Sequence, residues 1–294
     1  MTGVAAALSG AVRVAAGTCP DDLADELYSS WYAAPVAAEP APASGPPLPG
    51  LLSAAALRVA AWSPATVRQV DPAGGAVVRL ACGGHRAVLP GTWTRSADDP
   101  RAGLPMEPGD EVLVADVGGP VTAQGWWRSW SASPAWPHPV PREPLTRIYA
   151  CVTPHRAVEA VERAVTTLVP LPVPWMLKCA VTDAGFTRPD RLVVYLPDDG
   201  ATAALAGLAD ATAGLLDPHQ PPLAAPWSPG LSWAQDDGDG ASFGENRCAA
   251  LAAALGPWRR GGSGDGLEAA REGLRQAGID DRLPHLRRRT ASPA

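Results

Sequence analysis

Two proline-rich stretches limit most strongly what this chain can fold into. They are PVAAEPAPASGPPLPG at residues 35–50 and PAWPHPVPREP at residues 134–144. Proline fixes its own φ angle and lacks an N–H donor, so neither stretch can form a helix interior or a central strand. We therefore expect three parts: an N-terminal helix and linker over residues 1–52, a small β-rich module over 53–133, and a larger domain over 145–294.

The N-terminal part contains a short segment with the pattern of an amphipathic helix, PDDLADELYSSWYAA at residues 20–34. Either Asp21 or Asp22 can cap its first turn. Its apolar face is formed by Leu23, Leu27 and Trp31.

The segment from residue 54 to residue 130 has the pattern of a β-meander. Short apolar runs, beginning with ALRVAAW and including ATVRQV, AVVRLAC and EVLVADV, alternate with the turn-forming sequences DPAGG, GGH and EPGD. The last run, GWWRSW, closes the segment. We expect Trp126, Trp127 and Trp130 to form the hydrophobic edge of this module, with a ligand site as the alternative.

The third part alternates strand and helix patterns. Thr153 and Pro154 are typical of a helix start, at the N-cap and at the first helical position. The patterns predict strands at 147–152, 175–182 and 190–197, helices at 153–168, 200–216, 244–255 and 265–277, and a long loop at 217–242. The expected fold class is therefore α+β, with a small antiparallel β module followed by a mixed α/β domain that has a central sheet and flanking helices.

Composition excludes several classes of function. The net charge is −6 and no basic stripe is present, which argues against nucleic acid as a partner. No apolar run reaches the roughly 20 residues that span a bilayer, and the apolar N-terminus lacks the basic region of a signal peptide. The five cysteines are odd in number and form no C-x-x-C pair, so we expect buried free thiols in the cytoplasm and no structural zinc. The common nucleotide, hydrolase and metalloprotease motifs do not occur, and no metal or cofactor is expected.

Lys178 is the one lysine of the chain, against 23 arginines. It lies in the predicted strand WMLKCAVT, where strict alternation puts it on the face opposite Trp175, Leu177 and Cys179. A lysine among apolar residues can act as a general base or as a Schiff-base amine, and arginine can replace it in neither role. The alternative is a solvated lysine on the polar face of a half-covered sheet.

Arginine and tyrosine side chains alternate on the strands before and after Lys178. Arg147 and Tyr149 share one face of the first strand, and Arg191 and Tyr195 share one face of the other. If these strands pair with the Lys178 strand, the four side chains converge around its amine. Arginine binds phosphate through two parallel hydrogen bonds. The alternative is surface charge at the ends of strands.

Polar residues also concentrate in DDGDGASFGENR, residues 236–247. Ser242 and Glu245 have the spacing of a capping box, which leaves Asn246 and Arg247 in the first turn of a helix, where backbone N–H groups favour an anion. The acidic run lacks the ligand spacing of a calcium loop. His155, near the start of its helix, is either an acid or an ordinary polar residue of the first turn.

The stretch WSPGLSWAQDDGDGASFGENRCAALAAAL at residues 227–255 resembles the signature of the HopA family of bacterial type III effectors and their non-secreted relatives. SFGENRC is its most specific piece. The residues ENR and the two proline-rich stretches depart from the family pattern. Further similar segments follow in family order over nearly the whole chain, at 27–32, 123–130, 147–165, 176–181, 190–196 and 277–286.

The resemblance implies a function in the maturation of ribosomal peptides such as lanthipeptides and thioamitides. There a phosphotransferase-like kinase phosphorylates serine or threonine of a precursor peptide, and the HopA-like protein eliminates the phosphate to give dehydroalanine or dehydrobutyrine. Lys178 would be the base in such a phosphoserine/phosphothreonine lyase, and Tyr195, Tyr149 or His155 would protonate the leaving group. The implied phosphate- or substrate-binding residues are Arg147, Tyr149, Arg191, Glu245, Asn246 and Arg247.

Two other functions fit the same residues. A non-catalytic module could bind a peptide or phosphopeptide and present it to a partner kinase or cyclase, with the tryptophan-rich segment as its interaction surface. An effector acting on host proteins is the other alternative, although no export signal is recognisable.

Overall fold

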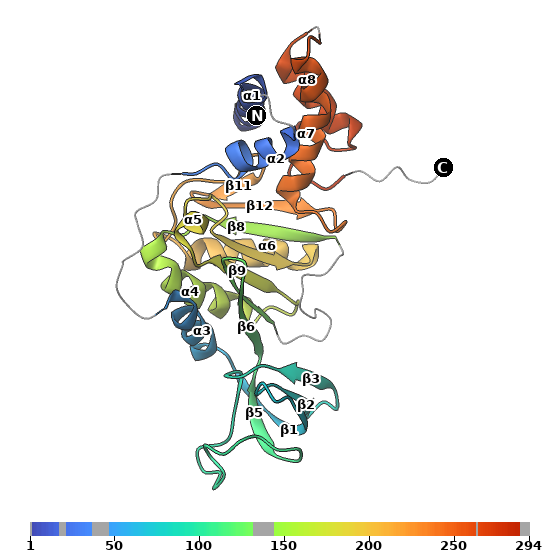
Figure 1. Ribbon diagram of the computed structural model, residues 1–294. Helices are drawn as coiled ribbons and strands as arrows, with labels where there is room; N and C mark the ends of the chain where they lie inside the picture. The colour runs from blue at the N-terminus through green and yellow to red at the C-terminus, as the bar shows by residue number, and fades with distance from the viewer. Residues whose placement is uncertain (1, 18–21, 37–46, 132–143, 263, 289–294) are drawn as a thin grey trace.

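A seven-stranded antiparallel sheet forms the centre of the computed structural model, which describes residues 2–17, 22–36, 47–131, 144–262 and 264–288 (Figure 1). Residues 37–46 and 134–143 of the two proline-rich stretches lie outside the described residues, as do Cys19 and Asp21. In spatial order the strands are β11 (Ala225–Ser228), β12 (Leu231–Asp236), β8 (Leu145–Ala150), β10 (Leu192–Leu196), β9 (Met176–Ala180), β7 (Trp126–Ser131) and β6 (Val117–Ala123).

A second, smaller sheet lies at one end of the molecule (Figure 1). Its strands are also antiparallel, in the order β3 (His85–Val88), β2 (Ala76–Leu80), β1 (Trp62–Val70), β5 (Glu111–Ala115) and β4 (Trp93–Thr94). Val67, Val78, Val112 and Val114 are buried between the curled strands and form a core separate from that of the large sheet. The predicted α+β fold class, with a small antiparallel sheet beside a larger mixed unit, is confirmed.

One face of the large sheet is covered by helices. α4 (Ala157–Leu168) packs against α3 (Leu48–Arg58) and α6 (Asp198–Ala211). The side chains on this face include the fully buried Trp127, whose Nε1 donates to Ser53 Oγ of α3 at 3.0 Å. Two short elements complete the unit, the 3-10 turn η2 (Pro154–Arg156) and α5 (Asp183–Phe186).

The remaining helices gather near β11 and β12, at the end of the molecule away from the small sheet (Figure 1). They are α1 (Thr2–Gly17), α2 (Leu23–Leu27), α7 (Phe243–Arg259) and α8 (Gly266–Gln276), and α2 continues directly into a π-helical turn, η1 (Tyr28–Tyr32). Asp22 caps α2 by accepting from the N–H groups of Ala24 at 2.9 Å and Asp25 at 3.2 Å. The predicted helix of residues 20–34 is thus present, with Asp22 as its cap.

Two predictions within residues 54–130 are wrong. The first apolar run is the end of helix α3 and not a strand, because its alanines and leucines favour a helix and the first strand begins at Trp62. Trp126, Trp127 and Trp130 do not form an edge of the small module, because β7 pairs with β9 in the large sheet. The segment assigned to the small module therefore contributes strands to both sheets.

Residues 217–242 are not one loop, since β11 and β12 form a hairpin within them. Gly230 has φ +75° in the turn between the strands, a conformation that glycine adopts readily. Pro226 lies in β11, where an edge strand tolerates its missing N–H. The many proline, glycine and aspartate residues hide the strand pattern.

The cysteine thiols of the described residues are free. Cys151, Cys179 and Cys248 are buried, and burial raises the pKa of each to about 12, whereas Cys82 is exposed. In the same described ranges, no helix is both long and apolar enough to cross a membrane.

Candidate functional site

The face of the large sheet opposite Trp127 brings together four of the predicted site residues. Strand β10 lies between β8 and β9, so Val193 is opposite Tyr149 on one side and Lys178 on the other. Tyr195 is opposite Arg147 by the same register. Because directly opposite residues of a sheet point to the same side, Lys178, Tyr195, Arg147 and Tyr149 share one face. Three of the four side chains expected around Lys178 thus share its face, but β8 does not pair with the Lys178 strand, because β10 lies between them.

Lys178 is half-buried and lies against aromatic rings. Its Nζ is 4.2 Å from the ring centroid of Trp126 and 5.7 Å from that of Tyr195. Such contacts attract a cation through the negative face of the ring. Within the part of the chain that the structure describes, no carboxylate forms an ion pair with this amine.

Arg147 shares this face with Lys178, two strands away, and is held in place from two sides. Its guanidinium pairs with Asp236 of β12 and stacks over the Tyr195 ring, 4.9 Å from the centroid. Burial acts to lower the pKa of Arg147, but Tyr195, Tyr149 and Asp236 together raise it above its ordinary value. The Arg147 charge is therefore permanent and fixed in orientation.

Arg188, in the turn before β10, is a cationic residue of this face that the sequence analysis missed. Its Nε and Nη2 donate to the two oxygens of Asp190 at 2.8 and 2.9 Å, and Nη2 also donates to the Tyr28 hydroxyl at 3.0 Å. It stacks between Tyr28 and Trp126, at 5.5 and 5.8 Å from the ring centroids. Arg188 thereby connects the N-terminal π-helical turn to the Lys178 region.

All four tyrosines of the chain lie in this region. Tyr28 and Tyr32 stack at 5.6 Å, and Phe243 of α7 contacts both Tyr32 and Tyr149, with centroids 6.2 and 6.5 Å away. Burial is the main cause that raises the pKa of Tyr32 and of Tyr149, so both hydroxyls stay protonated at neutral pH. We call the following residues the sheet-face cluster: Lys178, Arg147, Arg188, Tyr28, Tyr32, Tyr149, Tyr195, Trp126 and Phe243.

Arg191 does not present its charge to this face. Its Nε donates to the carbonyl of Arg188 at 2.9 Å, and its Nη1 donates to the carbonyl of Val152 at 3.1 Å and pairs with Asp217. The side chain is 0% exposed. Alternation put Arg191 on the face of Val193 and Tyr195, but it lies just before the strand and is held by the turns around Val152 and Asp217.

Arg247 likewise has a structural environment. Its Nη1 pairs with Asp237 at 3.0 Å, and its Nε and Nη2 donate to the carbonyls of Pro284 at 3.0 Å and Leu286 at 2.5 Å. Its side chain is 0% exposed, and burial lowers its pKa. These bonds fasten the C-terminal segment, residues 283–288, to the start of α7.

Asn246 also helps to hold the C-terminal segment against the start of α7. Its Nδ2 donates to Asp239 at 3.2 Å, and its Oδ1 accepts from Arg288 Nη2 at 2.9 Å. Asn246 is buried and fully used in these contacts. Neither Asn246 nor Arg247 is therefore available to bind a phosphate group.

The SFGE segment at the start of α7 positions an aromatic wall of the cluster. The predicted capping box is confirmed: Glu245 N–H donates to Ser242 Oγ at 3.2 Å, and Ser242 N–H donates to Glu245 Oε2 at 2.5 Å. A Cβ on Gly244 would lie 2.3 Å from the Tyr32 ring. Glu245 thus begins the helix, and the missing side chain of Gly244 makes room for Tyr32.

His155 lies exposed in η2, outside the strands β7, β8, β9 and β10 that contribute to the cluster. Besides Arg188, the cluster residues that the sequence did not indicate are Tyr28, Tyr32, Trp126 and Phe243. Alternation along GWWRSW, which puts Trp126, Arg128 and Trp130 on one face, would have found one of them. Nothing in the local sequence indicates that β7 pairs with β9.

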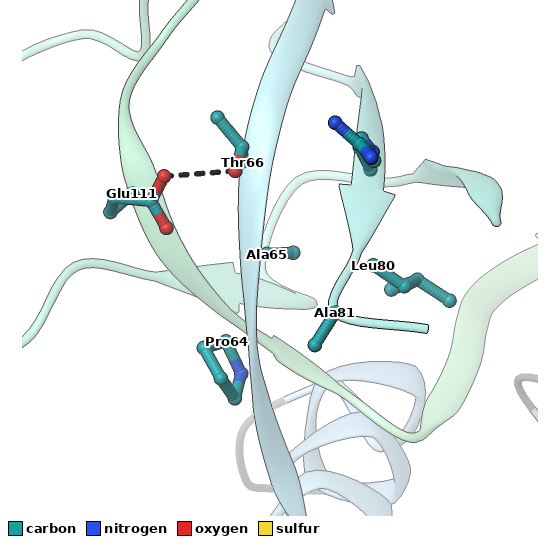
Figure 2. A pocket seen from close by; sticks show the side chains of 7 residues that line it. Pro64, Ala65, Thr66, Leu80, Ala81 and Glu111 are labelled. Atoms are coloured by element: carbon teal, nitrogen blue, oxygen red, sulfur yellow. Dashed lines mark hydrogen bonds between the residues drawn. The ribbon is translucent and has the colours of Figure 1, made fainter. Parts of the chain in front are cut away.

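A separate hollow of about 210 Å³ lies on the small sheet (Figure 2). It is lined by Pro64, Ala65, Thr66, Arg79, Leu80, Ala81 and Glu111. The Thr66 hydroxyl donates to the Glu111 carboxylate at 2.8 Å across its floor. None of these residues belongs to the sheet-face cluster, which contains the lysine and the tyrosine hydroxyls. The cluster is therefore the candidate site. Nowhere in the described ranges do three or more metal-binding side chains gather.

Comparison with known proteins gives a family match and two similar structures. The model of the HopA1 effector protein family matches residues 135–286, just over half of the chain. The structure of the effector protein from Pseudomonas syringae pv. tomato strain DC3000 is 14% identical, with a TM-score of 0.57, over 98% of this chain and 100% of that one. The effector protein from Pseudomonas syringae pv. syringae strain 61 is 15% identical, with a TM-score of 0.60, over 98% of both chains. At these identities the likeness shows a shared fold. No match was found among curated protein sequences.

Proposed function

The chain belongs to the HopA1 effector protein family, and from its sheet-face cluster we propose that it is a phosphoserine/phosphothreonine lyase acting on a peptide. One observation carries the proposal. The amine of Lys178, without a carboxylate partner in the described residues, shares one sheet face with the fixed Arg147 and lies 5.7 Å from the centroid of the Tyr195 ring. This is the set of groups that elimination of phosphate requires.

The reaction removes a proton from Cα and breaks the bond between Cβ and the phosphate oxygen. The electron pair of the Cα–H bond forms the Cα=Cβ double bond, and the phosphate leaves with the Cβ–O electrons. A base must accept the proton, and cations must stabilise the departing anion. In this proposal the Lys178 amine is the group that accepts the proton, because arginine cannot act as a base in proteins.

Tyr195 is the best-placed proton donor of the three predicted ones. It lies between Arg147 and Lys178, with its ring in contact with both cations. Tyr149 is buried against Phe243 and Tyr32. His155 lies in η2, outside the strands of the cluster. We therefore assign the protonation of the leaving oxygen to Tyr195 and a supporting role to Tyr149.

The proposed substrate is a ribosomal precursor peptide of the lanthipeptide or thioamitide type. A separate phosphotransferase-like kinase would supply the phosphate in the same compartment, which we take to be the cytoplasm. The product would carry dehydroalanine or dehydrobutyrine. No cofactor enters the proposed reaction.

The test is a phosphothreonine peptide incubated with the purified protein and followed by mass spectrometry. The wild-type chain should convert the peptide to a product lighter by one phosphoric acid. Lys178→Ala should slow this conversion by about 10³-fold, as expected for loss of a general base. Lys178→Arg keeps a positive charge and loses the base, so it should bind the peptide but not convert it.

A phosphopeptide-binding module without catalysis is the second candidate, because the same cations would hold a phosphate group. It predicts tight binding of the phosphopeptide and no change in its mass. Unchanged phosphopeptide, in the presence of the wild-type protein and the kinase that made it, would contradict the lyase proposal.

A further inference from the structure

Arg128 is the closest cationic neighbour of Lys178 in the strand register. β7 pairs with β9 so that Arg128 is directly opposite Lys178, between the pairs Trp126–Ala180 and Trp130–Met176. Directly opposite residues of an antiparallel pair point to the same side, with their Cβ atoms about 5 Å apart. The Arg128 side chain therefore starts on the same face as the sheet-face cluster.

The surroundings of Arg128 differ from those of the other arginines on this sheet. Arg147 pairs with Asp236, Arg188 with Asp190, and Arg191 with Asp217. Over the ranges that the structure describes, neither the Arg128 side chain nor the Lys178 side chain forms an ion pair or a hydrogen bond. Like charges directly opposite one another repel, and a bound anion relieves that repulsion.

We infer that Arg128 binds the phosphate group of the substrate and holds it beside the Lys178 amine, an inference that rests on the proposed function. Its planar guanidinium can give two parallel hydrogen bonds to one phosphate. Because the carboxylates of Asp236 and Asp190 compensate Arg147 and Arg188, Arg128 supplies the guanidinium charge that is open to the ligand. Arg128 and Trp126 both precede residue 135, so the site extends beyond the segment that the family model matches.

Binding can be measured without the reaction. The probe is a fluorescent peptide in which phosphothreonine is replaced by its phosphonate analogue, whose carbon–phosphorus bond cannot be eliminated as phosphate. Arg128→Gln should raise its Kd on the order of tenfold to hundredfold, the loss expected for a charge-assisted hydrogen bond. The Kd of Arg128→Lys should lie between those of the wild type and Arg128→Gln, since lysine keeps the charge and lacks the planar pair of donors.

The control is Arg68→Gln, which removes a residue of the same charge, exposed on β1 of the small sheet. It should leave the Kd unchanged, and the unphosphorylated threonine peptide should bind no variant tightly. If Arg128→Gln folds like the wild type and binds the phosphonate peptide as tightly, the inference is overturned.

The same measurements separate this inference from the lyase proposal. A wild-type chain that binds the phosphonate peptide through Arg128 but leaves the phosphopeptide unchanged overturns the lyase proposal alone. A chain that eliminates phosphate, with kcat and KM unchanged in Arg128→Gln, overturns the inference alone. If the wild type does not bind the phosphonate peptide, both are overturned.

Discussion

The start of α7 and the cluster-bearing face of the large sheet both carry arginines, yet the two regions use them in opposite ways. Arg247 in α7 is fully buried and bonded to Asp237 and to two carbonyls of the C-terminal segment. Arg128 and Lys178 on the sheet are half-buried and, within the described ranges, have no carboxylate partner. The most distinctive segment of the sequence, SFGENRC, thus holds the fold together, and less distinctive strands carry the groups that can meet a substrate.

This difference separates stability from activity. Removing one partner of a buried ion pair leaves the other charge less well compensated, which lowers the free energy of unfolding by several kcal/mol. Removing a half-buried cation that has only ring contacts costs about 1 kcal/mol or less. Substitutions in α7 should therefore change the free energy of unfolding, and substitutions on the sheet face should change binding and rate.

Arg247→Met should have the largest effect on stability, a loss of about 3–5 kcal/mol, because Asp237 would lose its closest cationic partner and the C-terminal segment would lose two hydrogen bonds. Urea unfolding followed by tryptophan fluorescence measures it. Lys178→Ala serves as the comparison and should unfold close to the wild type. Equal losses in the two variants would remove the distinction between the two regions.

Gly244→Ala should cost about 1–3 kcal/mol, because the added methyl group would lie 2.3 Å from the Tyr32 ring and must displace it. The unfolding free energy and the phosphopeptide elimination rate should both fall, since Tyr32 belongs to the aromatic wall. Gly256→Ala, in the same helix, is the control, because its nearest neighbour would be 3.6 Å away and alanine favours a helix. A Gly244→Ala chain as stable and as active as wild type would show that Tyr32 does not need this space.

Substitution of His285 in the C-terminal segment should have the smallest effect, a change in how the free energy of unfolding depends on pH. Burial and then the nearby Arg247 charge lower its pKa below the ordinary 6.5, so the folded state binds fewer protons there than the unfolded state. Its contribution to stability is therefore present above pH 6.5 and is lost as pH falls below that value. His285→Phe keeps a ring against Trp233, which His285 contacts edge-on at 4.9 Å, and should weaken this dependence.

The measurement for His285 is the unfolding free energy on both sides of pH 6.5, compared between the variant and the wild type. Acidic residues affect both chains equally and cancel in the difference. If the two chains lose the same stability on acidification, the C-terminal segment does not respond to pH through this histidine.

Local patterns predicted much of the fold and part of the site. Alternation put Arg147 and Tyr149 on one face of their strand, because a period of two is a property of any strand, whereas their place on the face of Lys178 depended on strand pairing. Spacing along the chain also predicted the capping box of Ser242. These signals lie within a few residues of one another, so the sequence alone contains them.

The parts that could not be predicted depend on contacts between distant segments. Arg128 and Trp126 reach the site through the pairing of β7 with β9, about fifty residues away, and Tyr28 and Tyr32 reach it by packing on α7. Arg191 has the right spacing, but its partners Val152 and Asp217 come from other turns. Pairing register and turn contacts of this kind are decided by tertiary packing.

The single lysine has a practical consequence for chemical labelling. Since the chain contains one ε-amino group, any amine-directed reagent that modifies a side-chain amine reports on the surroundings of Lys178 alone. That amine is half-buried and lies 4.2 Å from the indole ring of Trp126. A covalent dye or quencher attached there would therefore sit in the centre of the proposed site, with a native fluorophore beside it and no competing attachment point on any other side-chain amine.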